Sequence, residues 1–231
     1  MKDKEKTRQT DREEGAKGPS RRISLQVPLD VLRRDLEDFR QKALDFGSSM
    51  AAVIPADWAE VDERVRLKCS VPMCRYYGKN PYCPPQGPDL DFMRRALGRY
   101  HWAVLYALDV LPVSEFAERD VQREAGAKWA RKTMEIAGKL ETLAFGNGYY
   151  LAVAFAQGNC MAALCTAGDE CRVLQGKRCV QALKARPSME AVGIDVFALV
   201  SKAGWDVYPI YRSVEPGMVL RALSVGIVFV Y

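Results

Sequence analysis

The sequence predicts a single domain of the α/β (α+β) class, in which a mixed sheet supports two Cys-rich loops. Two nearly continuous apolar runs, residues 103–110 and 149–156, have the length and composition of buried strands. The segment between them, from about Glu115 to Phe145, has an apolar stripe on a charged background and is expected to be a long helix. These three elements form a strand–helix–strand unit, from which parallel sheets are built.

A first long helix is expected before this unit. Apolar residues recur there at alternating steps of three and four, which is the spacing of one helix face. Pro28 fits the first turn, and Gly47 ends the periodic stretch. The stripe consists of Leu29, Leu32, Leu36, Phe39, Ala43 and Phe46.

Short elements are expected to link this helix to the first buried strand. Residues 51–54 and 64–68 are predicted as short strands around a turn-prone Pro-Ala-Asp sequence. The second of these strands would lead the chain into Cys69. Asp89 is placed to cap a helix over residues 90–97.

The C-terminal part predicts one more helix and a last strand. Ser188 is suited to cap a helix, and Glu190 in its first turn would favour the positive end of the helix dipole. Gly204 would end this helix. Residues 225–231 form another apolar run, which predicts a buried strand.

Residues 1–22 are expected to form a disordered charged tail, and residues 23–231 a single domain. The tail has eight Lys or Arg and five Asp or Glu but almost no apolar side chains, so it cannot bury enough surface to fold. It also carries most of the net charge of +5. Because the remaining body is almost neutral, no nucleic-acid partner is expected.

The composition also predicts a cytoplasmic location. No apolar run approaches the roughly 20 residues that cross a bilayer, and the charged N-terminus has no signal-peptide core. Cytosolic thiols are kept reduced, so closely spaced cysteines there serve a metal or a reaction more often than a disulfide. We therefore expect neither a membrane partner nor a disulfide framework.

The seven cysteines fall into two groups, both in polar, Gly-containing segments. Structural buried cysteines belong on apolar elements, so this placement favours ligands over packing residues. The spacings match neither the tight pairs of zinc ribbons nor the bacterial ferredoxin run. The upstream group is Cys69, Cys74 and Cys83, and the downstream group is Cys160, Cys165, Cys171 and Cys179.

The ligand types narrow the choice of metal. His101 is the only histidine and lies next to a predicted strand, so it is expected to pack at the strand edge, and His-rich zinc sites are excluded. Thiolates alone suit four-cysteine zinc or an iron–sulfur cluster. The four downstream thiolates can complete one such site. The three upstream thiolates leave one position for another protein group, solvent or a substrate.

Two stretches resemble a prokaryotic family of predicted metal-binding proteins, a domain family of unknown function. The first is Cys-Ser-Val-Pro-Met-Cys-Arg-Tyr-Tyr-Gly at 69–78, with Cys-Pro-Pro at 83–85. The second is Cys179 followed by the distinctive Arg-Pro-Ser-Met-Glu-Ala at 186–191. The similarity covers roughly residues 25–231. This resemblance implies metal binding, and the number of cysteines favours iron–sulfur.

Two further side chains are candidates to act beside the thiolates. Arg186, a few residues past Cys179, could neutralise an anionic thiolate site or hold an anionic ligand beside it, and it could equally pair with Glu190. Tyr82 is placed to shield a site from water, which would affect its reduction potential. The residues that follow Arg186 are explained by entry into a helix alone.

The favoured interpretation is a cytoplasmic iron–sulfur protein with one or two 4Fe–4S clusters, active in electron transfer or as an accessory to a redox enzyme. A redox partner protein would accompany it. The alternative is a structural zinc-binding module whose metal staples the loops to the sheet. A further alternative is an enzyme that uses the open position of the three-cysteine site. Gly-rich phosphate loops, nucleophile elbows and two-residue redox pairs are absent from the sequence.

Overall fold

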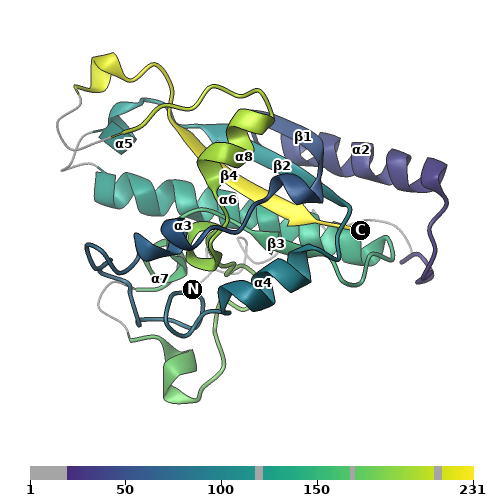
Figure 1. The fold of residues 1–231 in the computed structure, drawn as a ribbon, viewed down its shortest axis with the longest axis horizontal. Coiled ribbons are helices and arrows are strands. Elements are labelled where there is room, and N and C mark those ends of the chain that lie inside the picture. Colours follow the sequence, from purple (N-terminus) through teal and green to yellow (C-terminus); the bar gives the residue numbers. More distant parts are fainter. Residues whose placement is uncertain (1–19, 118–121, 167–169, 211–214) are drawn as a thin grey trace, which may run out of the picture.

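The computed structural model of this chain describes residues 20–117, 122–166, 170–210 and 215–231. At its centre is a four-stranded sheet in the order β1-β2-β4-β3 (Figure 1). With helices on both faces of this sheet, the chain is a single α+β domain, as the sequence predicts. The strands are β1 (Met50–Pro55), β2 (Trp102–Asp109), β3 (Val153–Phe155) and β4 (Leu223–Phe229).

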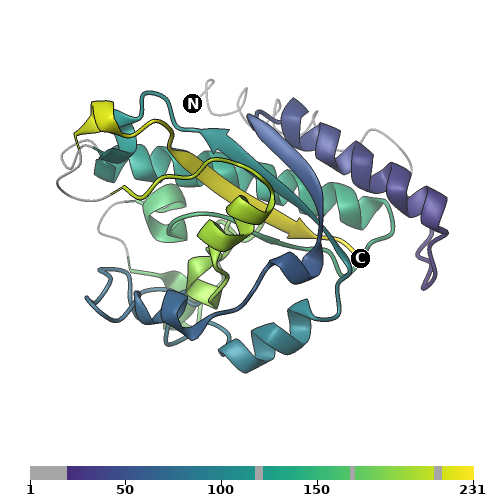
Figure 2. The same cartoon turned by 45° about the horizontal axis from the view of Figure 1, so that its top comes forward.

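Helices cover both faces of the sheet (Figure 2). α2 (Leu29–Asp45) contacts β1 and β2, and the long α6 (Gln122–Gly146) contacts β3 and β4 on the same face. α4 (Leu90–Leu97), α8 (Val196–Lys202) and the 3-10 turn η3 (Glu190–Val192) bury their apolar residues against the other face. The described short helices are α3 (Glu63–Leu67), α5 (Ser114–Ala117), α7 (Cys160–Leu164), η1 (Ala56–Trp58), η2 (Arg172–Gln175) and η4 (Pro216–Met218).

Strand β2 is apolar at nearly every position because both of its faces are buried. Val104 and Tyr106 pack in the cluster under α2 and α6, while Leu105 and Ala107 belong to the cluster under α4 and α8. All four are fully buried. Side chains alternate between the faces of a strand, so a strand covered on both sides requires an unbroken apolar run.

The strand–helix–strand unit is present, but its two strands are not neighbours. β2 and β3 both pair antiparallel with β4, which lies between them. They therefore run in the same direction, while every hydrogen-bonded pair, β1 with β2 included, is antiparallel. The sheet is thus antiparallel rather than mixed. A buried apolar strand has the same composition whichever neighbour it pairs with, so the sequence pattern could not place the last strand.

Gly226 interrupts the apolar run of β4 for a steric reason. It lies opposite Tyr106 in the sheet register. A Cβ atom at this position would lie 2.2 Å from the Tyr106 Oη. The phenol of Tyr106 instead crosses the glycine and donates a hydrogen bond to the Thr133 carbonyl on α6 at 2.7 Å. The glycine thus lets a buried tyrosine tie the sheet to the helix.

Residues 64–68 form helix α3 rather than the expected strand. The Asp62 carboxylate accepts a hydrogen bond from the backbone N–H of Arg64 at 2.7 Å and caps this helix. An alternation of polar and apolar residues over five positions is compatible with a strand and with one helical turn. Here the Asp62 cap favours the helix. The helix still leads the chain into Cys69, as expected of this segment.

Three other predicted elements are shorter than expected. The helix predicted over 115–145 is divided into α5 and α6, and residues 118–121 lie outside the described residues. Of the run 149–156, only β3 is a strand. The helix predicted from Ser188 becomes η3 and α8, because Gly193 adopts a φ of 85° and Asp195 then caps α8. The positive φ ends the first turn in a conformation that favours glycine.

The start of the described chain is attached to the domain through Arg21. Its guanidinium forms an ion pair with Asp35 of α2 and donates to the Asn147 carbonyl, in the turn after α6, at 2.7 Å. The expected tail otherwise falls on residues 1–19, outside the described residues. In the described parts of the chain, no helix combines the length and the apolar character needed to cross a membrane.

Candidate metal centre

Two loops from distant parts of the sequence lie side by side at one end of the domain. Residues 68–88 connect α3 to α4, and residues 156–186 follow β3, with 167–169 outside the described residues. Both run through the lower left of Figures 1 and 2. Asn159 in the second loop donates a hydrogen bond to the Sγ of Cys83 in the first, at 3.2 Å. The two cysteine groups therefore meet in space.

Cys160 lies among the thiols of both groups. Burial raises its pKa to about 12, and the neighbouring thiols of Cys83, Cys165, Cys171 and Cys179 contribute in the same direction. Each of these thiolates would repel a charge on Cys160. The downstream thiols thus influence one another, and Cys83 of the upstream group acts on Cys160 as well. A metal cation would instead lower the pKa of these thiols, because a thiol that coordinates a metal loses its proton.

The upstream group is connected in the same way. Burial raises the pKa of Cys69, and the nearby thiols of Cys74 and Cys83 raise it further. Cys74 is exposed, whereas the other six cysteines are partly buried, and all seven are free thiols. Cys83 interacts electrostatically with Cys74 and with Cys160, and this links the cysteines of the two loops, here termed the thiol cluster.

Two asparagines that sequence reasoning missed fix the position of the Cys83 sulfur. Asn80 and Asn159 each donate an Nδ2–H to this Sγ at 3.2 Å. The orientation of each amide group is fixed by other hydrogen bonds, because each Oδ1 accepts two backbone N–H groups. For Asn80 these N–H groups belong to its own loop, and for Asn159 they belong to α7. Burial raises the pKa of Cys83, and these two donors oppose the rise because they stabilise the thiolate. Their sequence signal is an amide residue beside a cysteine, as in Asn159-Cys160.

A third amide donor reaches the downstream group. The backbone N–H of Gln181 donates to the Cys179 Sγ at 3.4 Å. The side chain of Gln181 donates to the Leu164 carbonyl at 3.2 Å, so it ties the end of the loop to α7. Hydrogen bonds to ligand sulfurs are one of the means by which a protein tunes a thiolate metal site.

The donor set fits a thiolate-bound metal. Free thiols gather with N–H donors directed at two of them, and no histidine is among them. In the described residues, no three Cys, His, Asp or Glu side chains already form a ligand set for one ion. The final ligand geometry would therefore form only when the metal binds.

Comparison with known families agrees with this site. Over residues 52–222 the sequence matches the family described as "Predicted metal-binding protein (DUF2284)". The chain belongs to this family. The matched segment runs from β1 to just before β4 and includes all seven cysteines. No curated protein and no solved structure matches the chain. Membership in this metal-binding family supports a metal cofactor without specifying which metal.

Arg186 of this DUF2284 protein clamps the second cysteine loop to α6. Its guanidinium binds Glu141 through two hydrogen bonds, at 3.1 and 2.6 Å. It also donates to the Ala185 carbonyl at 2.9 Å. The same Glu141 accepts the backbone N–H of Ala154 in β3 at 2.6 Å. The acidic partner of Arg186 is therefore Glu141 and not Glu190, and the pair joins loop, helix and sheet.

Tyr82 interacts electrostatically with thiols of the second loop and with this ion pair. Burial raises its pKa, and the thiols of Cys160 and Cys179 act in the same direction, while Arg186 opposes them. Tyr82 belongs to the first cysteine loop but faces the cysteines of the second. Its partly buried ring is thus placed to limit water near the downstream thiols.

The Arg-Pro-Ser-Met-Glu-Ala stretch attaches this loop to the sheet. Ala156, just after β3, exchanges backbone hydrogen bonds with Pro187 and Met189 at 2.9 and 3.1 Å. Met189 is fully buried in the core. Glu190 lies close enough to Cys69 to raise the pKa of that thiol, and burial raises the pKa of Glu190 itself. Glu190 is thus the carboxylate beside the upstream group, a position that sequence reasoning did not give it.

His101 takes no part in this site. It is exposed at the start of β2, and its backbone N–H donates to the Tyr231 carbonyl at 2.5 Å. Its ring packs near the Tyr231 ring, with 6.5 Å between centroids. Among the described residues, the site therefore has no imidazole.

Proposed function

We propose that this protein holds iron–sulfur clusters of the 4Fe–4S type in its cysteine loops and uses them in electron transfer, alone or as an accessory to a redox enzyme. The observation that carries the proposal is that the two loops with all seven cysteines lie side by side, joined by the hydrogen bond from Asn159 to Cys83, with no disulfide among them. A 4Fe–4S cluster takes four thiolates. The downstream group supplies four, and the upstream group supplies three to a second cluster or joins the first.

The number and type of ligands favour a cluster over a single ion. A structural zinc site closes with four ligands, so one zinc ion would leave three thiols of this cluster without a role. The N–H groups that donate hydrogen bonds to the sulfurs of Cys83 and Cys179 would stabilise negative charge on a cluster. The bound cluster would supply one-electron chemistry. The chain would hold it, direct N–H groups at its ligands and limit water through Tyr82.

The surface of the cysteine loops suits an acidic protein partner. Residues 64–88 contain five Lys or Arg and no Asp or Glu, and residues 171–185 contain four and none. Large apolar side chains are exposed beside these cations. Exposed apolar side chains among mainly basic residues, with Glu170 as an acidic exception in the second loop, are suited to a fast, transient protein contact. The exposed apolar residues are Leu67, Val71, Met73, Leu174, Val180 and Leu183.

Reduction of anaerobically purified protein tests the proposed electron transfer. We expect a brown protein whose visible absorption bleaches on addition of dithionite and returns on reoxidation, because the cluster cycles between two charge states. The variant Cys160→Ser should lose most of this signal, whereas His101→Gln should keep it. A protein whose spectrum does not respond to dithionite would contradict the electron-transfer role.

A structural zinc module is the second candidate, and the polar character of the loops favours it. These loops bury few apolar side chains, so a metal could take the place of a small core, as it does in zinc modules. This reading predicts a colourless protein with zinc and no sulfide. With zinc bound, the loops would be folded, and the absorption spectrum would not respond to dithionite.

An enzyme that uses the upstream site is the third candidate. Cys69, Cys74 and Cys83 leave one position open, and Glu190 lies beside Cys69. A carboxylate there could hold the fourth position or receive a proton from a substrate. Replacing Glu190 by Gln separates these roles, since loss of metal indicates a ligand, while retained metal with unchanged spectra argues against any contact with the centre.

A further inference from the structure

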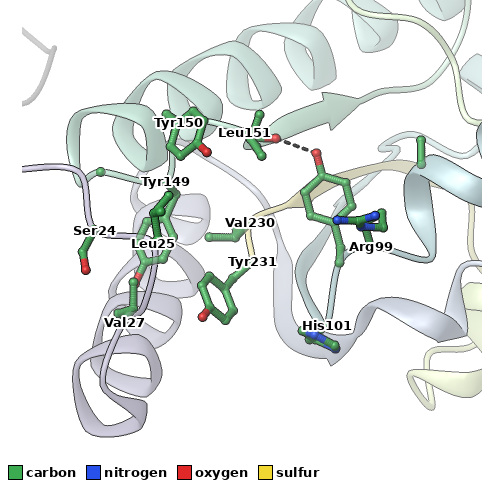
Figure 3. Close-up of a pocket in the computed structure, with 13 residues that line it drawn as sticks. Ser24, Leu25, Val27, Arg99, His101, Tyr149, Tyr150, Leu151, Val230 and Tyr231 are labelled. Carbon is green, nitrogen blue, oxygen red and sulfur yellow. Dashed lines mark hydrogen bonds between the residues drawn. The ribbon is translucent and has the colours of Figure 1, made fainter.

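A cavity of about 570 Å³ opens at the opposite end of the domain from the cysteine loops (Figure 3). Its walls come from residues 24–27, the end of α4 and the turn before β2, the turn after α6 and the end of the chain. In Figure 1 the C-terminus lies on the right, and the cysteine loops lie at the lower left. Small-molecule sites typically measure roughly 300–1,000 Å³, so the cavity has the size of a ligand site.

The walls of the cavity are held by hydrogen bonds that do not depend on a ligand. The hydroxyl of Tyr100 donates to the Leu151 carbonyl at 2.5 Å, and that of Tyr149 donates to the Asp35 carboxylate at 2.7 Å. The Tyr231 carbonyl accepts the backbone N–H of Trp102 at 2.8 Å. Preformed walls reduce the entropy that is lost when a ligand binds.

Aromatic rings make up much of this lining. Tyr100, Tyr149, Tyr150 and Tyr231 all face the cavity. The rings of Tyr149 and Tyr231 meet edge to face, with centroids 6.3 Å apart. Offset and edge-to-face contacts favour a flat aromatic guest over an aliphatic one of equal size. Leu151 at the rim is 63% exposed and offers further apolar surface to such a guest.

Among the side chains that line the cavity, that of Arg99 is charged. No Asp or Glu is among the thirteen lining residues, which include Arg99 (Figure 3). In the described parts of the chain, the Arg99 guanidinium has no acidic partner. Arg94 of the preceding helix α4 is by contrast paired with Asp91 and Glu63. An unpaired guanidinium at an aromatic cavity is a suitable partner for a carboxylate.

We propose that this cavity binds a small organic anion with an aromatic body. Its carboxylate or sulfonate would pair with Arg99, and its ring would lie among the tyrosines. The site is built from other residues than the thiol cluster, so it stands independently of the metal proposed there. It would give the protein a second binding activity at the opposite end of the sheet.

Calorimetric titration of the full-length protein tests the proposal with 2-naphthoate as the anionic probe and 2-naphthalenemethanol as its neutral analogue. Arg99→Gln should weaken naphthoate about tenfold, since one charge-assisted pair is lost, and should leave the neutral probe unchanged. The matched control is Arg95→Gln, an exposed arginine of α4 that does not line the cavity. It should change neither affinity.

A second variant tests the aromatic lining. Tyr150 is 42% exposed, so Tyr150→Ala should leave the thermal unfolding midpoint nearly unchanged. It should weaken both probes about threefold to tenfold, because one ring contact is removed. Absence of saturable naphthoate binding to the wild type would overturn the proposal. Equal losses in the Arg99→Gln and Arg95→Gln variants would overturn it as well.

Discussion

The sheet and the cysteine loops of this protein are held together by different means. Residues 103–107 of β2 are completely buried, and helices cover both faces of the sheet. The cysteine loops instead expose large apolar side chains, with Leu183 88% exposed, while their buried Asn80 is polar. Apolar burial stabilises the sheet, whereas amide-to-sulfur hydrogen bonds and the Arg186–Glu141 clamp position the loops. We infer that the sheet folds without metal and that the loops depend on it.

Truncation of one leucine in each region should give the largest contrast. Leu140 of α6 is 1% exposed, so Leu140→Ala should lower the free energy of unfolding by about 2–5 kcal/mol. Leu183→Ala, in the second cysteine loop, should change it by less than about 0.5 kcal/mol. Urea denaturation followed by circular dichroism measures both. Similar losses in the two variants would show that the loop residue is part of a core.

Metal removal should affect the loops and spare the sheet. After chelation we expect trypsin to cut at exposed sites in the cysteine loops, such as Lys68 and Arg178, about tenfold faster, because metal binding and loop folding are coupled. The helical circular dichroism signal should stay almost the same. Limited proteolysis with mass spectrometry identifies the sites. Equal protection with and without metal would mean that the loops are stable by themselves.

The two asparagines that donate to the Cys83 sulfur can be tested by a substitution that removes only the N–H donor. Asn159→Asp keeps an oxygen that can cap α7 but removes the N–H that reaches Cys83. We expect about a tenfold loss of metal affinity, as is usual when a group that orients a ligand is changed. Asn80→Asp should behave alike, since it donates to the same sulfur.

Competition with a chelator measures these affinities. A variant Asn159→Ala that loses affinity while Asn159→Asp keeps it would assign this residue to helix capping alone.

The smallest effect is expected at Asp62, at the entry to the first cysteine loop. Hydrogen bonds from Arg64 lower the pKa of Asp62 to about 2. Since the folded-state pKa is below the ordinary value, the stabilisation is present above about pH 4 and is lost as the pH falls toward 2. Asp62→Asn should therefore lower the thermal unfolding midpoint slightly at neutral pH, and the difference should vanish in acid. A difference that stays constant down to pH of about 2 would exclude the carboxylate as its cause.

Much of the fold could be predicted because buried helices and strands impose a regular pattern of apolar residues on the sequence. The stripe of α2, the Asp89 cap of α4 and the apolar runs of β2 and β4 are all present. The order of strands could not be predicted, because β4 is equally apolar beside any neighbour. The strand predicted over residues 64–68 is wrong, because a five-residue pattern is compatible with both helix and strand. The Asp62 cap stabilises the helix there.

The candidate site was predictable in its cysteines and less so in their surroundings. The clustering of thiols in the sequence pointed to one region, and the structure brings the two groups together there. The partner of Arg186 was not predictable, since Glu141 is 45 residues away on a helix. Asn80 and Asn159 were missed for the same reason, because an amide reveals its role only when its target sulfur is placed by the fold.

Iron, acid-labile sulfide and zinc per chain, measured on anaerobically purified protein, test the central claim most directly. The proposed centre predicts about four to eight iron atoms with an equal amount of sulfide, and little zinc. In the Cys160→Ser variant, iron and sulfide should fall together by half or more. Stoichiometric zinc without sulfide, or an iron content that no cysteine variant lowers, would contradict an iron–sulfur centre in these loops.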